Sequence, residues 1–97
     1  MIRIVKMNFK EECVQDFLKL FEERKNKIRH SKGCNYLELW NDIDIKTIYY
    51  SYSIWDSMDD LNEYRQTELF KDTWAQFKSW FQDKAHVFNI EKNEIAI

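Results

Sequence analysis

Three side chains of this 97-residue chain could bind a polar ligand group or handle a proton, namely Asn8, Tyr64 and His86. A phenol and an amide donate hydrogen bonds, and an imidazole can act as a general base near neutral pH. Asn8 has the same parity as Ile2 and Ile4 in the first predicted strand, and we expect helices to cover that side. Because an inward-pointing amide needs a hydrogen-bond partner, Asn8 is expected either to contact a ligand or to bridge two parts of the structure.

Large aromatic side chains could form the walls of a pocket for a flat ligand around these groups. The candidates for substrate binding are Tyr50, Tyr52, Trp55 and Trp74. Tyr50 and Tyr52 share one parity in a predicted strand, and we expect them to face the helices and line the cavity. Core packing is the simpler interpretation of both tryptophans and of Tyr64, since aromatic residues dominate hydrophobic cores as well.

The histidines and cysteines show no pattern typical of a metal site. His86 stands near the start of the last predicted strand, and it could act as a general base only if its ring turns inward. A solvated surface histidine is the alternative interpretation. Cys13 and Cys34 fit no metal-ligand spacing, and we expect reduced thiols because no secretion signal precedes them. We therefore predict no metal ion.

The spacing of apolar residues predicts the elements that must position these groups. They are a strand over 2–9, a helix over 11–29, strands over 34–41 and 46–55, a short helix after Ser57 that carries Tyr64, a longer helix that carries Phe70 and Phe81, and a strand from Ala85. Gly33, the only glycine, is suited to a left-handed turn after the first helix. The order β-α-β-β-α-(α)-β predicts a ferredoxin-like α+β fold with a four-stranded antiparallel sheet, in one domain over residues 1–97.

Composition and charge restrict the classes of partner. The formal net charge is −2, and basic residues are interspersed with acidic ones without forming a basic stripe, so no nucleic-acid partner is expected. No apolar run approaches membrane-spanning length and no charged-then-apolar leader opens the chain. We therefore expect a cytoplasmic protein that does not insert into membranes.

The stretch "IYYSYSIWD" over residues 48–56 carries bulky side chains on both of its faces. Tyr50 and Tyr52 lie on one face, and Tyr49 and Trp55 lie on the other. Helices of so short a chain cover one side of the sheet, and exposing several large apolar groups on the other side is unfavourable. We therefore expect a homodimer through the open sheet face. The alternative is a monomer whose tyrosines line an open groove.

Three short motifs stand at the borders of the predicted elements. The first is Gly33–Leu39, "GCNYLEL", in the strand after the first helix. The second is Trp55–Ser57, "WDS", at the end of a strand and before a short helix, and the third is Leu69–Lys71, "LFK", at the start of the following helix. Together they resemble the motifs of the antibiotic biosynthesis monooxygenase (ABM) domain family, and the first differs from the family pattern by one residue in the placement of Tyr and Glu. The element order fits as well, so the resemblance covers essentially the whole chain.

The resemblance implies a dimeric α+β barrel, which agrees with the expectation from the two-faced strands. Some members of the family are cofactor-free monooxygenases of polycyclic aromatic phenols or quinols, and others degrade haem. Cofactor-free oxygenation needs a substrate that itself reduces oxygen once it is deprotonated. The protein then supplies an apolar slot, hydrogen bonds to the oxyanion and, in some cases, a base. The resemblance therefore implies no cofactor.

The haem-degrading branch is similar to this chain at one position and differs at two. Asn8 matches an asparagine of that branch, whereas Tyr64 stands in place of its tryptophan and Trp74 in place of its histidine. Many other members carry histidines where Tyr64 and Leu69 stand here. Because the haem-ligating histidine is missing, haem degradation is not expected.

The sequence thus predicts a monooxygenase of a quinol-like or phenolic aromatic molecule, with Asn8, Tyr64 and His86 as catalytic candidates. The alternative is a non-catalytic module of the same fold that binds a small aromatic ligand, which the missing family histidines favour. An isomerase on the same scaffold is a third option, but its acid–base residues are not recognisable in this chain.

Overall fold

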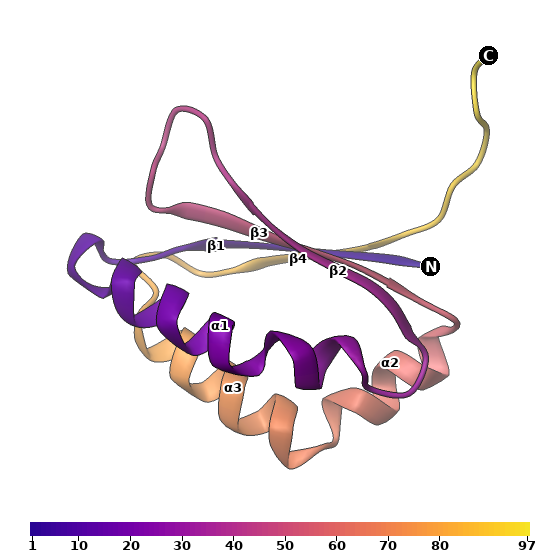
Figure 1. Ribbon diagram of the computed structural model, residues 1–97. Coiled ribbons are helices and arrows are strands. Elements are labelled where there is room, and N and C mark those ends of the chain that lie inside the picture. Colours follow the sequence, from indigo (N-terminus) through magenta and orange to yellow (C-terminus); the bar gives the residue numbers. More distant parts are fainter.

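A four-stranded antiparallel sheet carries all the helices on one of its sides (Figure 1). The computed structural model describes residues 1–97, and its sheet has the strand order β2-β3-β1-β4. The elements are β1 (Ile2–Asn8), a 3₁₀ turn η1 (Glu11–Cys13), α1 (Val14–Arg29), β2 (Cys34–Asn41), β3 (Ile48–Trp55), α2 (Met58–Arg65), α3 (Glu68–Ser79) and β4 (His86–Ile90). The predicted ferredoxin-like α+β fold is confirmed.

Each helix begins close to the position that the sequence predicts. The predicted helix over 11–29 starts as the 3₁₀ turn and becomes α-helical at Val14. At the start of α2 the Ser57 hydroxyl accepts a hydrogen bond from the Asp60 amide at 3.1 Å. At the start of α3 the Thr67 hydroxyl accepts one from the Phe70 amide at 3.2 Å. These caps satisfy amide groups that a helix terminus otherwise leaves unpaired.

Gly33 forms the left-handed turn that the sequence predicts between α1 and β2. Its φ angle is +82°, which side chains with a Cβ atom rarely adopt. A Cβ atom at this position would also lie 2.5 Å from Cβ of Asp60, in the first turn of α2. The glycine therefore lets the start of α2 approach the α1–β2 turn closely.

The side chains between sheet and helices form two hydrophobic clusters. In the first cluster Phe9, the residue directly after β1, stacks on Phe17 of α1, with ring centroids 4.0 Å apart. In the second, Trp55 of β3 packs against Tyr64 of α2, with centroids 5.0 Å apart. The two clusters divide the interior of the molecule into a region near η1 and a region near α2.

The register of β1 and β3 shows which side chains face the helices, and here one prediction is wrong. The buried residues of β1 are Arg3, Val5 and Met7, so the other parity, which includes Asn8, faces away from the helices. Tyr50 pairs with Lys6 and therefore shares that helix-free side.

Tyr52 pairs with Ile4 and lies on the same helix-free side, so neither tyrosine lines the space under the helices. Both parities of β1 are apolar, but Val5 and Met7, together with Phe9 directly after the strand, form the buried cluster that contains Phe17 of α1. Assigning the other set to the interior reverses every side chain of the sheet, because side chains alternate along a strand.

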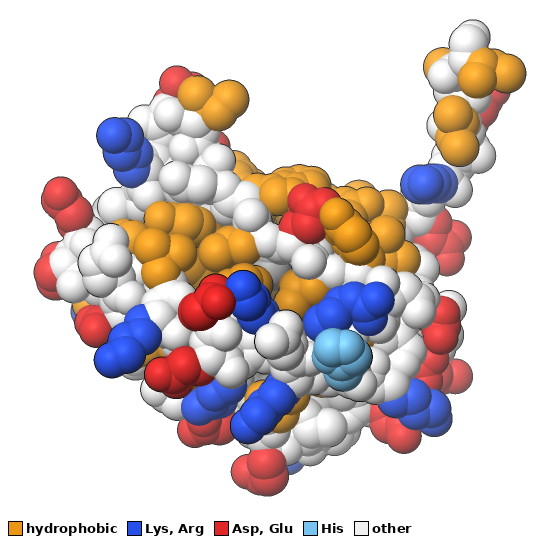
Figure 2. Space-filling model, in the orientation of Figure 1, with side chains coloured by type: hydrophobic (Ala, Val, Ile, Leu, Met, Phe, Trp, Pro, Cys, Tyr) orange, Lys and Arg blue, Asp and Glu red, His pale blue; other side chains and the backbone are white.

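The helix-free side of the sheet, which we call the open face, exposes large apolar groups. They are Tyr36, Trp40, Phe88 and Ile90, with exposed fractions between 39% and 49%. Trp40 of β2 stacks on Tyr52 of β3, with ring centroids 4.7 Å apart. Hydrophobic side chains gather along this upper side in the space-filling view (Figure 2). The β2–β3 loop and the C-terminal tail rise on the same side at opposite ends of the sheet (Figure 1).

Candidate functional site

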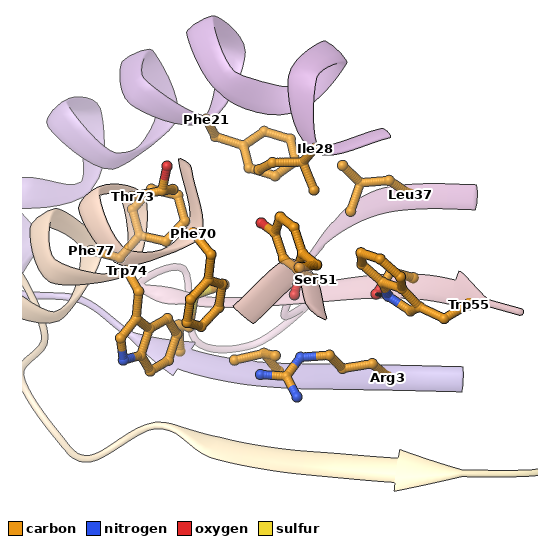
Figure 3. A pocket seen from close by; sticks show the side chains of 14 residues that line it. Arg3, Phe21, Ile28, Leu37, Ser51, Trp55, Phe70, Thr73, Trp74 and Phe77 are labelled. Carbon is orange, nitrogen blue, oxygen red and sulfur yellow. Dashed lines mark hydrogen bonds between the residues drawn. The ribbon is translucent and has the colours of Figure 1, made fainter. Parts of the chain in front are cut away.

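A partly open cavity of about 70 Å³ lies between the sheet and the helices. It is lined by side chains of both hydrophobic clusters, including Met7 and Phe77 of the first and Trp55 and Tyr64 of the second. Figure 3 shows α1 above the cavity, α3 at its left and the strands β1 and β3 below it. An apolar cavity with a few polar groups is the usual form of a small-molecule site.

Aromatic rings form much of the wall of this cavity. Phe70 and Trp74, one helical turn apart on α3, hold their rings nearly parallel, with an interplanar angle of 8° and centroids 6.1 Å apart. Tyr64 meets Phe70 edge to face at 5.3 Å. Such rings offer flat surfaces against which a planar ligand can pack.

The Tyr64 hydroxyl is a proton-bearing group available to a ligand. No protein group forms a hydrogen bond with it. Every side-chain oxygen or nitrogen that is fully buried in this protein does have a hydrogen-bond partner. The hydroxyl must therefore keep accessible surface, although Tyr64 as a whole is buried and lines the cavity. Burial raises the pKa of Tyr64 above its ordinary value, so the phenol stays protonated and donates a hydrogen bond at neutral pH.

Three other polar groups of the lining, on Trp55, Ser53 and Thr73, already have protein partners. The Trp55 indole N–H donates to the Ser53 hydroxyl at 2.9 Å. The Thr73 hydroxyl accepts a hydrogen bond from Nη1 of Arg24 at 2.8 Å, and Nη2 of Arg24 pairs with Asp72 at 2.8 Å. Arg24 thereby joins α1 to α3 at the upper side of the cavity. These bonds hold the wall in place more than they offer contacts to a ligand.

Arg3 is a lining residue that the sequence analysis did not identify. The residue is only 8% exposed, and its one hydrogen bond to a side chain joins Nη1 to Oδ1 of Asn89 at 3.5 Å. Burial, together with the nearby charge of Arg65, lowers the pKa of Arg3 to about 10, so the guanidinium stays charged at neutral pH. The signal in the sequence was a charged residue on the same parity as Val5 and Met7.

The structure brings three of the predicted site residues together at the cavity. Tyr64, Trp55 and Trp74 all line it, from α2, β3 and α3 respectively. Their roles toward a ligand stay predictions. Trp55 and Tyr64 are also members of the second hydrophobic cluster, so packing and ligand contact are compatible for them.

Asn8 lies outside the cavity, and the structural bridge is the role that the geometry gives it. Its amide nitrogen donates to Asp83 at 2.7 Å, and its amide oxygen accepts a hydrogen bond from Thr47 at 2.8 Å. Asn8 therefore connects the end of β1 to the loop before β3 and to the loop before β4. The expectation that its amide points toward the helices is wrong.

The remaining candidates, Tyr50, Tyr52 and His86, also lie on the open face. The Tyr50 hydroxyl donates to Asp42 at 3.2 Å, and Tyr52 packs against Trp40. His86 pairs with Lys6 in the β1–β4 ladder and is exposed, so its ring does not turn inward. The prediction that the two tyrosines line the cavity is wrong, because they point to the opposite side of the sheet.

No group of three or more His, Cys, Asp or Glu side chains in the chain lies close enough together to hold a metal ion. None of the helices combines the length and the apolar composition needed to cross a membrane.

Comparison with known proteins identifies related sequences and folds. A family model described as antibiotic biosynthesis monooxygenase matches residues 1–76. No curated protein matches the chain.

Solved structures share the fold at low sequence identity. A crystal structure of an antibiotic biosynthesis monooxygenase has a TM-score of 0.88 at 18% identity, covering 97% of this chain and 100% of that one. A protein of Mycobacterium tuberculosis also has a TM-score of 0.88, at 16% identity, covering 99% of this chain and 97% of its own. A conserved protein of Methanosarcina mazei Go1 has a TM-score of 0.84 at 19% identity, with 90% and 87% covered. At these identities the likeness concerns the fold alone.

Proposed function

The chain belongs to the antibiotic biosynthesis monooxygenase family, and on that premise we propose that it oxygenates a quinol-like or phenolic aromatic molecule without a cofactor. The observation that supports this proposal most directly is the aromatic-walled cavity, where the Tyr64 hydroxyl is available to a ligand. Phe70 and Trp74 are placed to pack against the ring of a planar substrate.

The chemistry needs few protein groups because the substrate supplies the electrons. A phenolate transfers one electron to O₂, and the resulting aryloxyl radical and superoxide combine to form a C–O bond. The peroxide takes up a proton, and loss of water from the same carbon leaves a carbonyl. One oxygen atom thus enters the ring, the other leaves in water, and two substrate hydrogens are removed. Tyr64 donates a hydrogen bond to the oxyanion and so stabilises the charge that moves during these steps.

The size of the cavity favours a small ring over a polycyclic one. Its volume of about 70 Å³ is below that of an engineered protein cavity of about 150 Å³ that holds benzene. A one-ring phenol therefore enters only if lining side chains such as Phe70 and Trp74 move. A polycyclic quinol would need a much larger rearrangement.

Oxygen uptake on a panel of hydroquinones and anthrols tests the oxygenase proposal. We expect uptake above the uncatalysed rate with at least one member, and the Tyr64→Phe variant should lower that rate about 100- to 1,000-fold because it removes an oxyanion donor. Tyr50→Phe is the matched control, since it removes a hydroxyl on the open face and should leave the rate unchanged. Uptake no faster than the background across the panel would refute the proposal.

A second candidate function is a non-catalytic module that binds a small aromatic ligand. The observation that favours it is the absence of any histidine, aspartate or glutamate among the residues that line the cavity. Such a lining has no general base, so it activates only substrates that are already acidic. A thermal shift with a phenol that is bound but not consumed would favour this module over the enzyme.

We also propose that two copies associate through the open face. The exposed aromatic side chains of β2 and β4 support this proposal, because a contiguous apolar surface is unfavourable in water. The β2–β3 loop and the C-terminal tail flank that face, and Ile95 and Ile97 of the tail are themselves exposed (Figure 1). The cavity lies on the other side of the sheet, so dimerisation would leave it accessible.

A further inference from the structure

The Arg3 guanidinium is a buried positive charge without a counterion in the chain. No carboxylate lies within salt-bridge distance of it, and its only side-chain partner is the neutral amide of Asn89 at the long distance of 3.5 Å. Buried charges in proteins are usually paired, because removing an ion from water is costly. Arg3 therefore lacks a partner that its burial requires.

The neighbouring residues do not compensate for this charge. Asp72 is paired with Arg24, and Asp60 with Lys32. Among charged groups, Arg65 has the largest effect on the pKa of Arg3, and it adds further positive potential. The cavity is therefore electropositive near Arg3, at the start of β1, although most of the residues that line it are apolar.

The unused donors of Arg3 are directed toward the cavity. No fully buried side-chain nitrogen lacks a partner, so the guanidinium nitrogens without a hydrogen bond must keep accessible surface in a residue that lines the cavity. Figure 3 shows the side chain lying along the floor of the cavity with its guanidinium directed toward Phe70 and Trp74. The Tyr64 phenol adds a further free donor in the same space.

We propose that this cavity is a site for a small planar anion, either an aromatic carboxylate or the phenolate of an acidic phenol. The charged group of the ligand accepts hydrogen bonds from the guanidinium of Arg3 and from the Tyr64 hydroxyl, and its ring packs against Phe70 and Trp74. A guanidinium matches the geometry of a carboxylate well, because two parallel N–H groups meet two oxygens.

This inference deepens the proposed function and rests on the same cavity being the ligand site. Since the lining contains no general base, the substrate of an oxygenase here has to enter already ionised, and Arg3 favours that form. Binding of an anion does not depend on turnover. The two proposals can therefore fail separately.

Calorimetric titration of the full-length protein with matched pairs of probes tests the inference. The pairs are acetate and acetamide, benzoate and benzamide, and salicylate and salicylamide, so each pair differs mainly in charge and the series differs in size. We expect at least one anion to bind about tenfold or more tightly than its amide. Equal affinity within every pair, or no binding of any anion at millimolar concentration, would overturn the proposal and would mean that the charge of Arg3 is neutralised from elsewhere.

Variants then assign the effect to one residue. Arg3→Gln should weaken binding of the anion about tenfold or more and leave the amide unaffected, and Arg3→Lys should retain part of the preference. Lys71→Gln is the control, since it removes one positive charge from an exposed position of α3 outside the cavity lining. Retention of full anion affinity by a folded Arg3→Gln protein would overturn the assignment.

The outcome also separates the two proposals. Anion binding that depends on Arg3, without oxygen uptake on any phenol, would leave the anion site standing and refute the oxygenase. Oxygen uptake with a phenol that binds the wild-type protein and the Arg3→Gln variant with equal affinity would support the oxygenase and refute the anion site.

Discussion

Arg3 shows at the scale of a single residue how a ligand site can lower the stability of the free protein. Its burial and the charge of Arg65 lower its pKa to about 10, which means that the folded protein disfavours the charged form. In the unfolded chain the same guanidinium is fully hydrated. In the proposed complex a bound anion would recover the free energy lost on burial, so we expect the unliganded protein to be less stable than its apolar packing alone would make it.

Arg3→Met is therefore expected to stabilise the unliganded protein. An apolar side chain of similar length removes the desolvation cost of the buried charge, and we expect the free energy of unfolding to rise by about 1–4 kcal/mol. Urea unfolding with and without benzoate measures this, and benzoate should stabilise the parent protein but not the variant. A destabilised Arg3→Met protein would mean that the guanidinium is well paired.

The sign of the pKa shift also determines how the difference in stability between Arg3→Met and the parent protein depends on pH. Below about pH 10 the guanidinium is charged in both the folded and the unfolded chain, so the cost of burying it is present in full. The cost decreases only as the pH rises through about 10, where the folded state loses the proton first. The stability difference between Arg3→Met and the parent should thus stay constant from about pH 6 to about pH 9.

At the scale of the elements, the position of α2 depends on one turn between α1 and β2. Gly33 adopts a left-handed conformation there, and Asp60 of α2 occupies the position that a Cβ atom of residue 33 would need. Asp60 lies in the same short helix as Leu61 and Tyr64, which are both buried. A change in this turn therefore displaces the helix that carries the Tyr64 hydroxyl to the cavity.

Gly33→Ala should destabilise the protein through this turn. The left-handed conformation alone costs a residue with a Cβ atom about 1–3 kcal/mol, and the new atom would lie 2.5 Å from Asp60. Lys32→Arg is the control from the same turn and should change the free energy of unfolding by less than about 0.5 kcal/mol, because Lys32 is exposed and the charge that pairs with Asp60 is kept. Thermal and urea unfolding measure both; similar stabilities of the two variants would contradict this account.

At the scale of the whole molecule, the sheet separates two surfaces that differ in shape and composition. The side under the helices contains the cavity, whereas the open face carries exposed aromatic groups such as Trp40 and Phe88. A face-to-face pair of such sheets buries apolar surface on both partners at once, which is the simplest way to cover it. The proposed dimer would leave each cavity on the outside of the pair of sheets.

Substitutions on the two faces of β4 test the dimer. Phe88 lies on the open face and is 49% exposed, whereas its neighbour Val87 points to the other side of the strand and is 43% exposed. Light scattering should give the parent and Val87→Lys a mass of about twice 12.0 kDa, and Phe88→Lys should reduce the mass toward that of one chain because it buries a charge in the interface. A parent protein of single-chain mass at micromolar concentration would refute the dimer.

Local patterns in the sequence were sufficient to predict the elements and their order. Helical spacing, the Ser57 cap and the left-handed glycine each depend on residues a few positions apart, and all three are confirmed, except that α3 ends at Ser79 and does not carry Phe81. The match to the family then agrees with the order of the elements. Of the site, the sequence predicted three cavity residues, which were Tyr64, Trp55 and Trp74.

Only the tertiary structure decided which face of the sheet the helices cover. Both parities of β1 and β3 are apolar, so alternation alone gives two solutions, and the contact between Phe9 and Phe17 selects one of them. That choice placed Asn8 and the β3 tyrosines outside and turned Arg3 inward. A strand determines which side chains point the same way, but the side that is buried depends on contacts between residues far apart in the sequence.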